Sequence, residues 1–211
     1  HHCTIYCVDP GTDLSNLRDT FAGRYFSSLA AGTPPIIYPP GMAKIIPAGW
    51  KLLVSMHYQA VGKKVVDQTQ VGLKLAAPFN VKQEVKTLLM RNSTFIIPPH
   101  AGNHQMNVSS EISQDSLLLS LYFHMHLRGK SFRFEAHYPN GSSEILLDVP
   151  RWDFNWQHPF QLENPKQLPA GTVLKAVVCY DNSANNPSNP DPTVRVKPGQ
   201  KSTDEMCRGF V

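Results

Sequence analysis

The sequence has few charged residues and no long apolar run. Charged side chains make up 17% of the 211 residues, and the net charge of +4 comes from basic residues scattered along the chain, so we expect no nucleic-acid partner. The longest apolar run, which ends at Phe123, is far shorter than the ~20 residues of a membrane-spanning helix, so we expect no membrane insertion. Internal repeats and coiled-coil heptads are absent. A hydrophobic content of 41% supports a packed core in one or two domains.

Cysteine is also scarce, with four residues in the chain. On one strand Cys3 and Cys7 would lie about 13 Å apart, too far for a disulfide. Cys179 and Cys207 could close a loop, and the chain-entropy model gives such a link about 3–4 kcal/mol. A disulfide would require an oxidising compartment, so we expect an exported protein, periplasmic or extracellular. No secretion signal is visible, but a chain that begins with His1 rather than Met leaves this uninformative.

The apolar run leads directly into His124 and His126, with Met125 between them. Residues 116–126 read as a buried β-strand because apolar residues dominate and charged residues are absent. Side chains alternate in a strand, so the two histidines project from one face, roughly 6–7 Å apart along the chain. Two imidazoles on one face can bind one metal ion, although simple hydrogen bonding at a sheet edge is the commoner explanation of an isolated pair.

Three further histidines lie in the amino-terminal part. His1 and His2 begin a predicted strand, and His57 lies in another. Adjacent histidines on a regular strand face opposite ways, so His1 and His2 can share one ion only at a strand end or a bulge. Two alternatives are the tail of a purification tag and a mature amino terminus that holds copper, as in lytic polysaccharide monooxygenases. His57 taken alone is as readily a buried core histidine.

Short strands separated by turns make up most of the predicted structure. The Asn-Gly pair within 139–141 is typical of tight hairpins, and the whole pattern is typical of antiparallel β-sandwiches. We therefore predict an all-β fold with two antiparallel, jelly-roll-like β-sandwich domains. Residues 1–80 form a partial domain, incomplete at its amino end, and residues 81–211 form a complete one. Residues 13–21 indicate a brief helix or an irregular loop. Strands are predicted over residues 1–7, 51–58, 71–75, 87–90, 93–97, 105–112, 116–126, 131–138, 143–149 and 172–180.

The stretch 181–192 is rich in Asn, Pro and Ser. Its composition alone is that of a low-complexity linker. Asn and Pro also build rigid loops of Asx turns, so the sequence leaves both structures open.

The order of the candidate residues resembles the copper type II, ascorbate-dependent monooxygenases, the family of the peptidylglycine α-hydroxylating and dopamine β-monooxygenases. The His-x-His pair is followed, much later in the chain, by Asp-Glu-Met-Cys at 204–207. The segment 154–157 (Phe-Asn-Trp-Gln) and the stretch 180–192 are similar to bacterial members, which occur as domains of larger exported redox proteins. This resemblance covers nearly the whole chain. It implies a small-molecule substrate, dioxygen as a second partner, and fused redox domains in a full-length protein.

The resemblance also implies two copper sites with different donor sets. The oxygen-binding copper, which is the catalytic centre, takes the His-x-His pair and a methionine: His124, His126 and Met206. The electron-transfer copper takes an adjacent histidine pair and a histidine followed by tyrosine: His1, His2 and His57. Imidazole suits copper in both oxidation states, and a thioether favours Cu(I). The implied activity is C–H hydroxylation with dioxygen and ascorbate or a similar reductant. The alternative is a non-catalytic copper-binding or interaction module of a larger exported redox protein.

A disulfide and a substrate cleft are further implications of the resemblance. The disulfide would join Cys179 and Cys207. Animal amidating members hold a peptide carboxylate with an Arg two residues before the His-x-His pair, and with Asn and Tyr just after Met-Cys. Those positions are Tyr122, Arg208 and Phe210 here, so peptide amidation is not expected. Tyr122 and Arg208 remain candidate substrate-binding residues.

Overall fold

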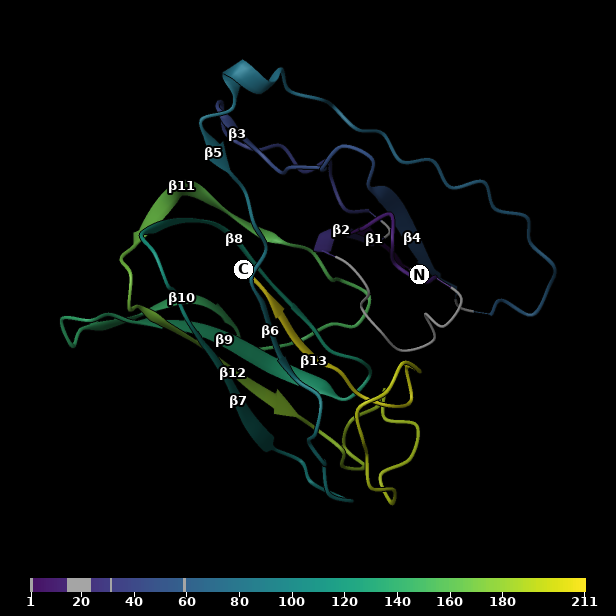
Figure 1. Ribbon diagram of the computed structural model, residues 1–211. Helices are drawn as coiled ribbons and strands as arrows, with labels where there is room; N and C mark the ends of the chain where they lie inside the picture. Colours follow the sequence, from purple (N-terminus) through teal and green to yellow (C-terminus); the bar gives the residue numbers. More distant parts are fainter. Residues whose placement is uncertain (1, 15–23, 31, 59) are drawn as a thin grey trace. The chain divides into compact units, whose positions relative to one another are not determined.

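A computed structural model describes residues 2–14, 24–30, 32–58 and 60–211. The chain divides into two compact units, His1–Thr87 and Leu88–Val211, whereas the sequence places the junction at residues 76–80. Strands dominate both units, and the one helical element in the described residues is the short 3₁₀ turn η1 (Pro78–Asn80) (Figure 1). The predicted all-β fold is confirmed. None of the described helical segments is long and apolar enough to cross a bilayer.

The second unit is a sandwich of two four-stranded antiparallel sheets (Figure 1). Its strands are β6 (Leu89–Asn92), β7 (His104–Glu111), β8 (Ser116–His124), β9 (Gly129–His137), β10 (Ser143–Val149), β11 (Phe160–Leu168), β12 (Val173–Tyr180) and β13 (Cys207–Phe210). One sheet has the order β10-β9-β12-β7, and the other has the order β11-β8-β13-β6. The strand that carries the first His-x-His histidine is therefore hydrogen-bonded to the last strand of the chain.

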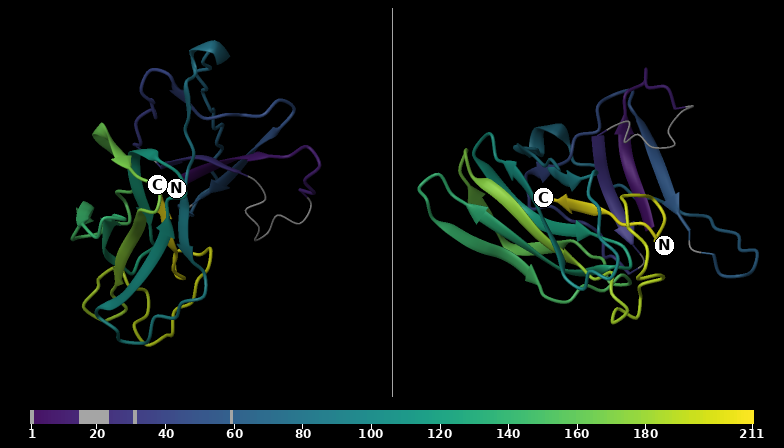
Figure 2. Two further views of the ribbon diagram at one scale, coloured as in Figure 1. Left: turned by 60° about the vertical axis from the view of Figure 1, so that its left-hand side comes forward. Right: turned by 90° about the horizontal axis from the view of Figure 1, so that it is seen from below.

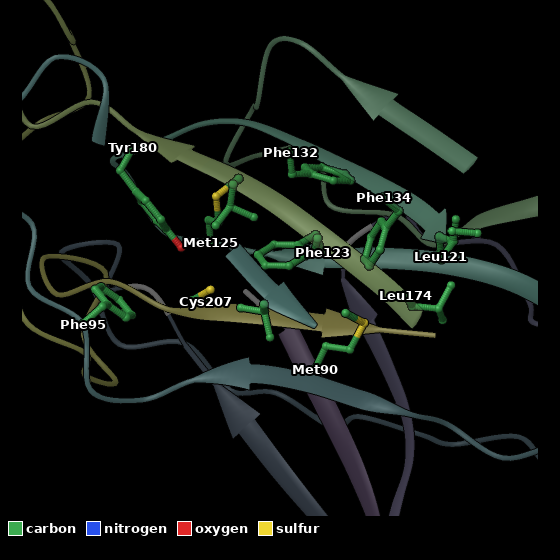
Figure 3. Close-up of a cluster of buried hydrophobic side chains, with 14 of the residues drawn as sticks. Met90, Phe95, Leu121, Phe123, Met125, Phe132, Phe134, Leu174, Tyr180 and Cys207 are labelled. Atoms are coloured by element: carbon green, nitrogen blue, oxygen red, sulfur yellow. The ribbon is translucent and has the colours of Figure 1, made fainter. Parts of the chain in front are cut away.

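Alternating side chains build the core between these two sheets. Every second residue of β12 is buried, as expected for a strand with one face on a core. Phe123, Phe132 and Phe134 pack together there (Figure 3), with ring centroids 5.6, 5.9 and 6.1 Å apart. Gly209 of β13 faces the same cluster, and a Cβ atom on it would lie 3.2 Å from the Phe123 ring. β13 therefore turns one face to the core and the other face away from it.

The first unit contains a three-stranded antiparallel sheet in the order β2-β1-β4 and a short parallel pair of β3 with β5 (Figure 2). The bounds are β1 (His2–Val8), β2 (Arg24–Ala30), β3 (Met42–Ala43), β4 (Lys51–His57) and β5 (Gln83–Glu84). Cys3, Ile5 and Cys7 are buried along β1, so this strand is the centre of the sheet in both pairing and packing.

Two of the predicted strands differ in the structure. The predicted strand over 71–75 is wrong, because Val71, Leu73 and Leu75 are exposed and this segment pairs with no strand among the described residues. Weak alternation is therefore not enough to form a strand without a partner edge. The predicted strand over 93–97 is reduced to an isolated bridge between Ile97 and Val196.

Three strands are absent from the sequence prediction: β2, β11 and β13. β11 reads as a polar segment and includes Pro165, and its register with β8 shifts between Gln161 and Lys166. Proline and irregular pairing are typical of an edge strand, and β11 lies at the edge of its sheet. Most of the helix or loop predicted over 13–21 falls outside the described residues.

Candidate metal centre on strands β8 and β13

Strand β8 separates the histidines from the core. Leu121 and Phe123 face the core and are fully buried, so Tyr122 and His124 lie on the opposite face. His126 follows just beyond the strand end, and its ring lies beside that of His124, with centroids 5.1 Å apart and ring planes at 82°. The two rings are 7% and 5% exposed. The structure thus brings together the two imidazoles that the sequence pattern predicts on one face.

Strand β13 carries the methionine to the same face. Arg208 pairs with His124 and Phe210 with Tyr122 in the antiparallel register, and the Tyr122 and Phe210 rings stack at 5.3 Å. Continuing this register by two residues sets Met206 opposite His126. Met206 is 6% exposed but does not belong to the hydrophobic core cluster, whereas its neighbour Cys207 does. The thioether is therefore buried on the histidine side of the sheet.

Glu205 joins the two chain segments that carry these side chains. Its carboxylate accepts hydrogen bonds from the backbone N–H of His126 (2.8 Å) and Met206 (3.2 Å) through Oε2, and from that of Arg128 (2.6 Å) through Oε1. The residue is completely buried, and this burial raises the pKa of Glu205 to about 7, against the opposing effect of the three hydrogen bonds and Arg128. One carboxylate thus fixes the spacing between His126 and Met206.

The remaining polar atoms of His126 are also engaged. The ring atom Nδ1 lies 3.2 Å from the backbone oxygen of Asp204. The carbonyl of His126 accepts from Trp152 Nε1 at 3.1 Å and from the Gly129 amide at 3.2 Å. A Cβ atom on Gly129 would lie 2.5 Å from the Trp152 ring, so only glycine allows the tryptophan this close.

His124 has a side-chain partner of its own. Its Nδ1 lies 2.6 Å from Gln157 Oε1, which also accepts from the Tyr122 hydroxyl at 3.3 Å. Gln157 Nε2 donates to the Phe154 carbonyl at 2.8 Å. The segment 154–157 therefore packs against the strand face that carries the histidines.

Arg128 and the loop 181–192 support the centre from its far side. The fully buried Arg128 donates to Asn182 Oδ1 (2.8 Å) and to the carbonyls of Thr203 (2.7 Å) and Asp191 (3.4 Å). Asx-type bonds from the amides at 183, 188, 191 and 193 brace the loop, which lies at one end of the sandwich in the yellow part of the chain (Figures 1 and 2). The loop of Asx turns, one of the two structures left open by the sequence, is confirmed.

In the first unit, β1 and β4 bring a second pair of histidines together. His2 pairs with His57 in the antiparallel register, and the ring centroids are 4.3 Å apart. His1, the third predicted ligand, lies outside the described residues. Two of the three residues predicted for the electron-transfer copper are thus neighbours.

The predicted disulfide between Cys179 and Cys207 is wrong, and all four cysteines are free. Cys207 points into the core, where the Tyr180 hydroxyl hydrogen-bonds to its thiol, as the close-up of the core shows for the two labelled side chains (Figure 3). Tyr180 takes the inward position at the end of β12, so Cys179 faces the other side of that sheet. Burial raises the pKa of Cys207 to about 11, which keeps this thiol protonated at neutral pH.

The donor set at the second-unit site fits copper. Within the described part of the chain, no three side chains among His, Cys, Asp and Glu converge as a metal site. Two imidazoles and a thioether form a different set, soft enough for Cu(I). Tyr122 and Arg208, the candidate substrate residues, lie on the same face of β8 and β13 as His124.

Sequence reasoning did not assign roles to Glu205, Gln157 or Arg128. Glu205 had one sequence signal, a carboxylate directly beside the candidate methionine. Gln157 and Arg128 act through partners distant in sequence, so no local pattern identifies them.

Comparison with known proteins adds little. No family model matches the chain, and no curated protein does. A solved structure of infectious bursal disease virus, Gt strain, has a TM-score of 0.32 and 10% identity, and the match covers 99% of this chain and 48% of that one. A second, of the Gx strain, has a TM-score of 0.27 and 9% identity, with coverage of 99% and 56%. The chain thus spans about half the length of these viral chains, and likeness at this level carries no argument about fold or function.

Proposed function

We propose that the second unit binds copper through His124, His126 and Met206, and that the protein is a copper-dependent monooxygenase similar to the copper type II, ascorbate-dependent family. The observation that carries this proposal is the shared anchor of the ligands. The imidazoles lie 5.1 Å apart, and Glu205 binds the amides of both His126 and Met206 through one oxygen.

The proposed reaction is hydroxylation of a C–H bond. One oxygen atom of O₂ enters the substrate and the other leaves as water, so R–H + O₂ + 2e⁻ + 2H⁺ gives R–OH + H₂O. Ascorbate or a similar donor supplies the two electrons. Copper supplies the redox chemistry when bound, and the residues of this chain hold it and exclude water.

The protein groups have separate tasks in this scheme. His124 and His126 present ring nitrogens from a buried face, and Met206 supplies a soft donor that favours the reduced metal. Tyr122 and Arg208, on the same face, would contact the substrate. His2 and His57, together with His1, would hold the electron-transfer copper in the first unit.

An exported location, periplasmic or extracellular, remains part of the proposal. It rests on the resemblance alone, because the disulfide that would have supported it does not form. Fused redox domains in a full-length protein belong to the same proposal.

Copper stoichiometry and oxygen uptake test the proposed function together. We expect two coppers per chain and ascorbate-dependent oxygen consumption above the free-copper background. Met206→Ile should abolish this uptake, whereas Met106→Ile, a partly buried methionine of β7, should retain it. One copper or none, with no uptake above background, would contradict the enzyme and favour a non-catalytic copper-binding module.

A further inference from the structure

The amide of Gln157 has a defined orientation. Its Nε2 atom donates to the Phe154 carbonyl at 2.8 Å, and a carbonyl oxygen can only accept. The nitrogen is therefore on that side, and Oε1 faces His124 and Tyr122. The Tyr122 hydroxyl at 3.3 Å is a donor to the same oxygen, which agrees with this orientation.

This orientation determines which nitrogen of His124 carries the proton. Oε1 lies 2.6 Å from Nδ1, so Nδ1 must be the donor, and a neutral ring then has its lone pair on Nε2. The Asp204 carbonyl near His126 Nδ1, at 3.2 Å, sets the same tautomer there. Both rings thus offer Nε2 as the metal-binding atom.

We propose that Gln157 is a positioning residue that holds His124 as the Nδ1–H tautomer and aims its Nε2 atom at the metal position. The metal part of this inference rests on the proposed function; the tautomer part does not. Gln157 is itself nearly buried, so water does not readily replace its oxygen. Partners of this kind on metal-binding histidines typically change metal affinity 10–100-fold when removed.

Nitrogen-15 NMR of the imidazoles in the metal-free protein tests the proposal directly. At about pH 8 an ordinary imidazole is neutral, and pyrrole-type and pyridine-type nitrogens have well-separated shifts. In the parent protein we expect pyrrole-type Nδ1 for His124. Gln157→Leu should move the proton of His124 to Nε2 and leave His126 unchanged. Gln157→Glu, which keeps an acceptor oxygen, should retain Nδ1–H.

Gln161→Leu, at an exposed glutamine of β11, is the matched control and should change neither ring. Nε2–H on His124 in the parent protein would overturn the proposal even if Gln157→Leu failed to fold. An unchanged His124 spectrum in a folded Gln157→Leu variant would overturn it as well.

Copper affinity gives the second readout. Cu(I) titration against a competing chelator should show about 10–100-fold weaker binding in Gln157→Leu and near-parent binding in Gln157→Glu. Equal affinity in all three proteins would overturn the positioning role. Failure of the parent protein to bind Cu(I) would instead refute the proposed function, and the tautomer measurement would stand independently of it.

Discussion

His124 and His126 in the second unit and His2 and His57 in the first are both pairs of neighbouring imidazoles, but they are built differently. Cross-strand register sets the first-unit pair, since His2 and His57 are direct partners on β1 and β4. The second-unit pair lies along one chain segment, and buried side chains distant in sequence fix it, chiefly Glu205. Register alone can bring two rings together, whereas adding a third donor from a remote strand takes a buried polar anchor.

Glu205→Ala should have the largest effect, because it leaves three buried backbone N–H groups without their acceptor. We expect a loss of about 3–5 kcal/mol in the free energy of unfolding of the second unit. Urea denaturation followed by tryptophan fluorescence measures it, since Trp152 and Trp156 lie in that unit. Glu163→Ala, at an exposed position, should cost less than about 0.5 kcal/mol. Equal losses in both variants would contradict the anchor.

The same carboxyl group should make stability depend on pH. Burial raises the pKa of Glu205 from 4.5 to about 7 in the folded state, so between these values the folded state binds more protons than the unfolded state. The free energy of unfolding should therefore fall as pH rises through this window, by on the order of 3 kcal/mol at most. Denaturation of the parent protein and Glu205→Ala at several pH values tests this. Parallel curves for the two proteins would refute it.

Asn182→Ala should have the next largest effect. The amide is fully buried and binds Arg128, Asn189, Pro98 and Val194. We expect a loss of about 2–3 kcal/mol and faster hydrogen exchange across the loop 181–193, measured by mass spectrometry. Asn103→Ala, at an exposed position, is the control. Unchanged exchange in the loop would show that it needs no anchor.

His57→Ala should have the smallest effect on stability, below about 1 kcal/mol, because register rather than the ring pairing holds β1 and β4 together. Copper binding should fall from two ions to one per chain, measured by metal analysis after gel filtration. His137→Ala, on the hairpin strand β9, should leave both ions bound. Loss of both coppers in His57→Ala would contradict two independent sites.

Period-two alternation explains how much of this was predictable. The apolar run before His124 correctly predicts a core strand with the histidines on the other face, and the turn-rich pattern correctly predicts an all-β fold. The same alternation argues against the disulfide, since apolar residues at 174, 176, 178 and 180 point Cys179 away from the core. That parity outweighs a favourable loop length.

The anchors could not be predicted in this way. Glu205 reaches the amide of His126 across 79 positions, and Gln157 reaches the ring of His124 across 33. Such contacts exist only once both sheets are assembled. Strand β11 was missed for a related reason, since its polar sequence becomes a strand only because β8 offers an open edge.

X-ray absorption on the Cu(I)-loaded protein tests the central claim most directly. We predict a copper–sulfur scattering path that disappears in Met206→Ile and persists in Met106→Ile. A parent protein that binds Cu(I) with nitrogen ligands only, and no sulfur path, would contradict the proposed oxygen-binding site.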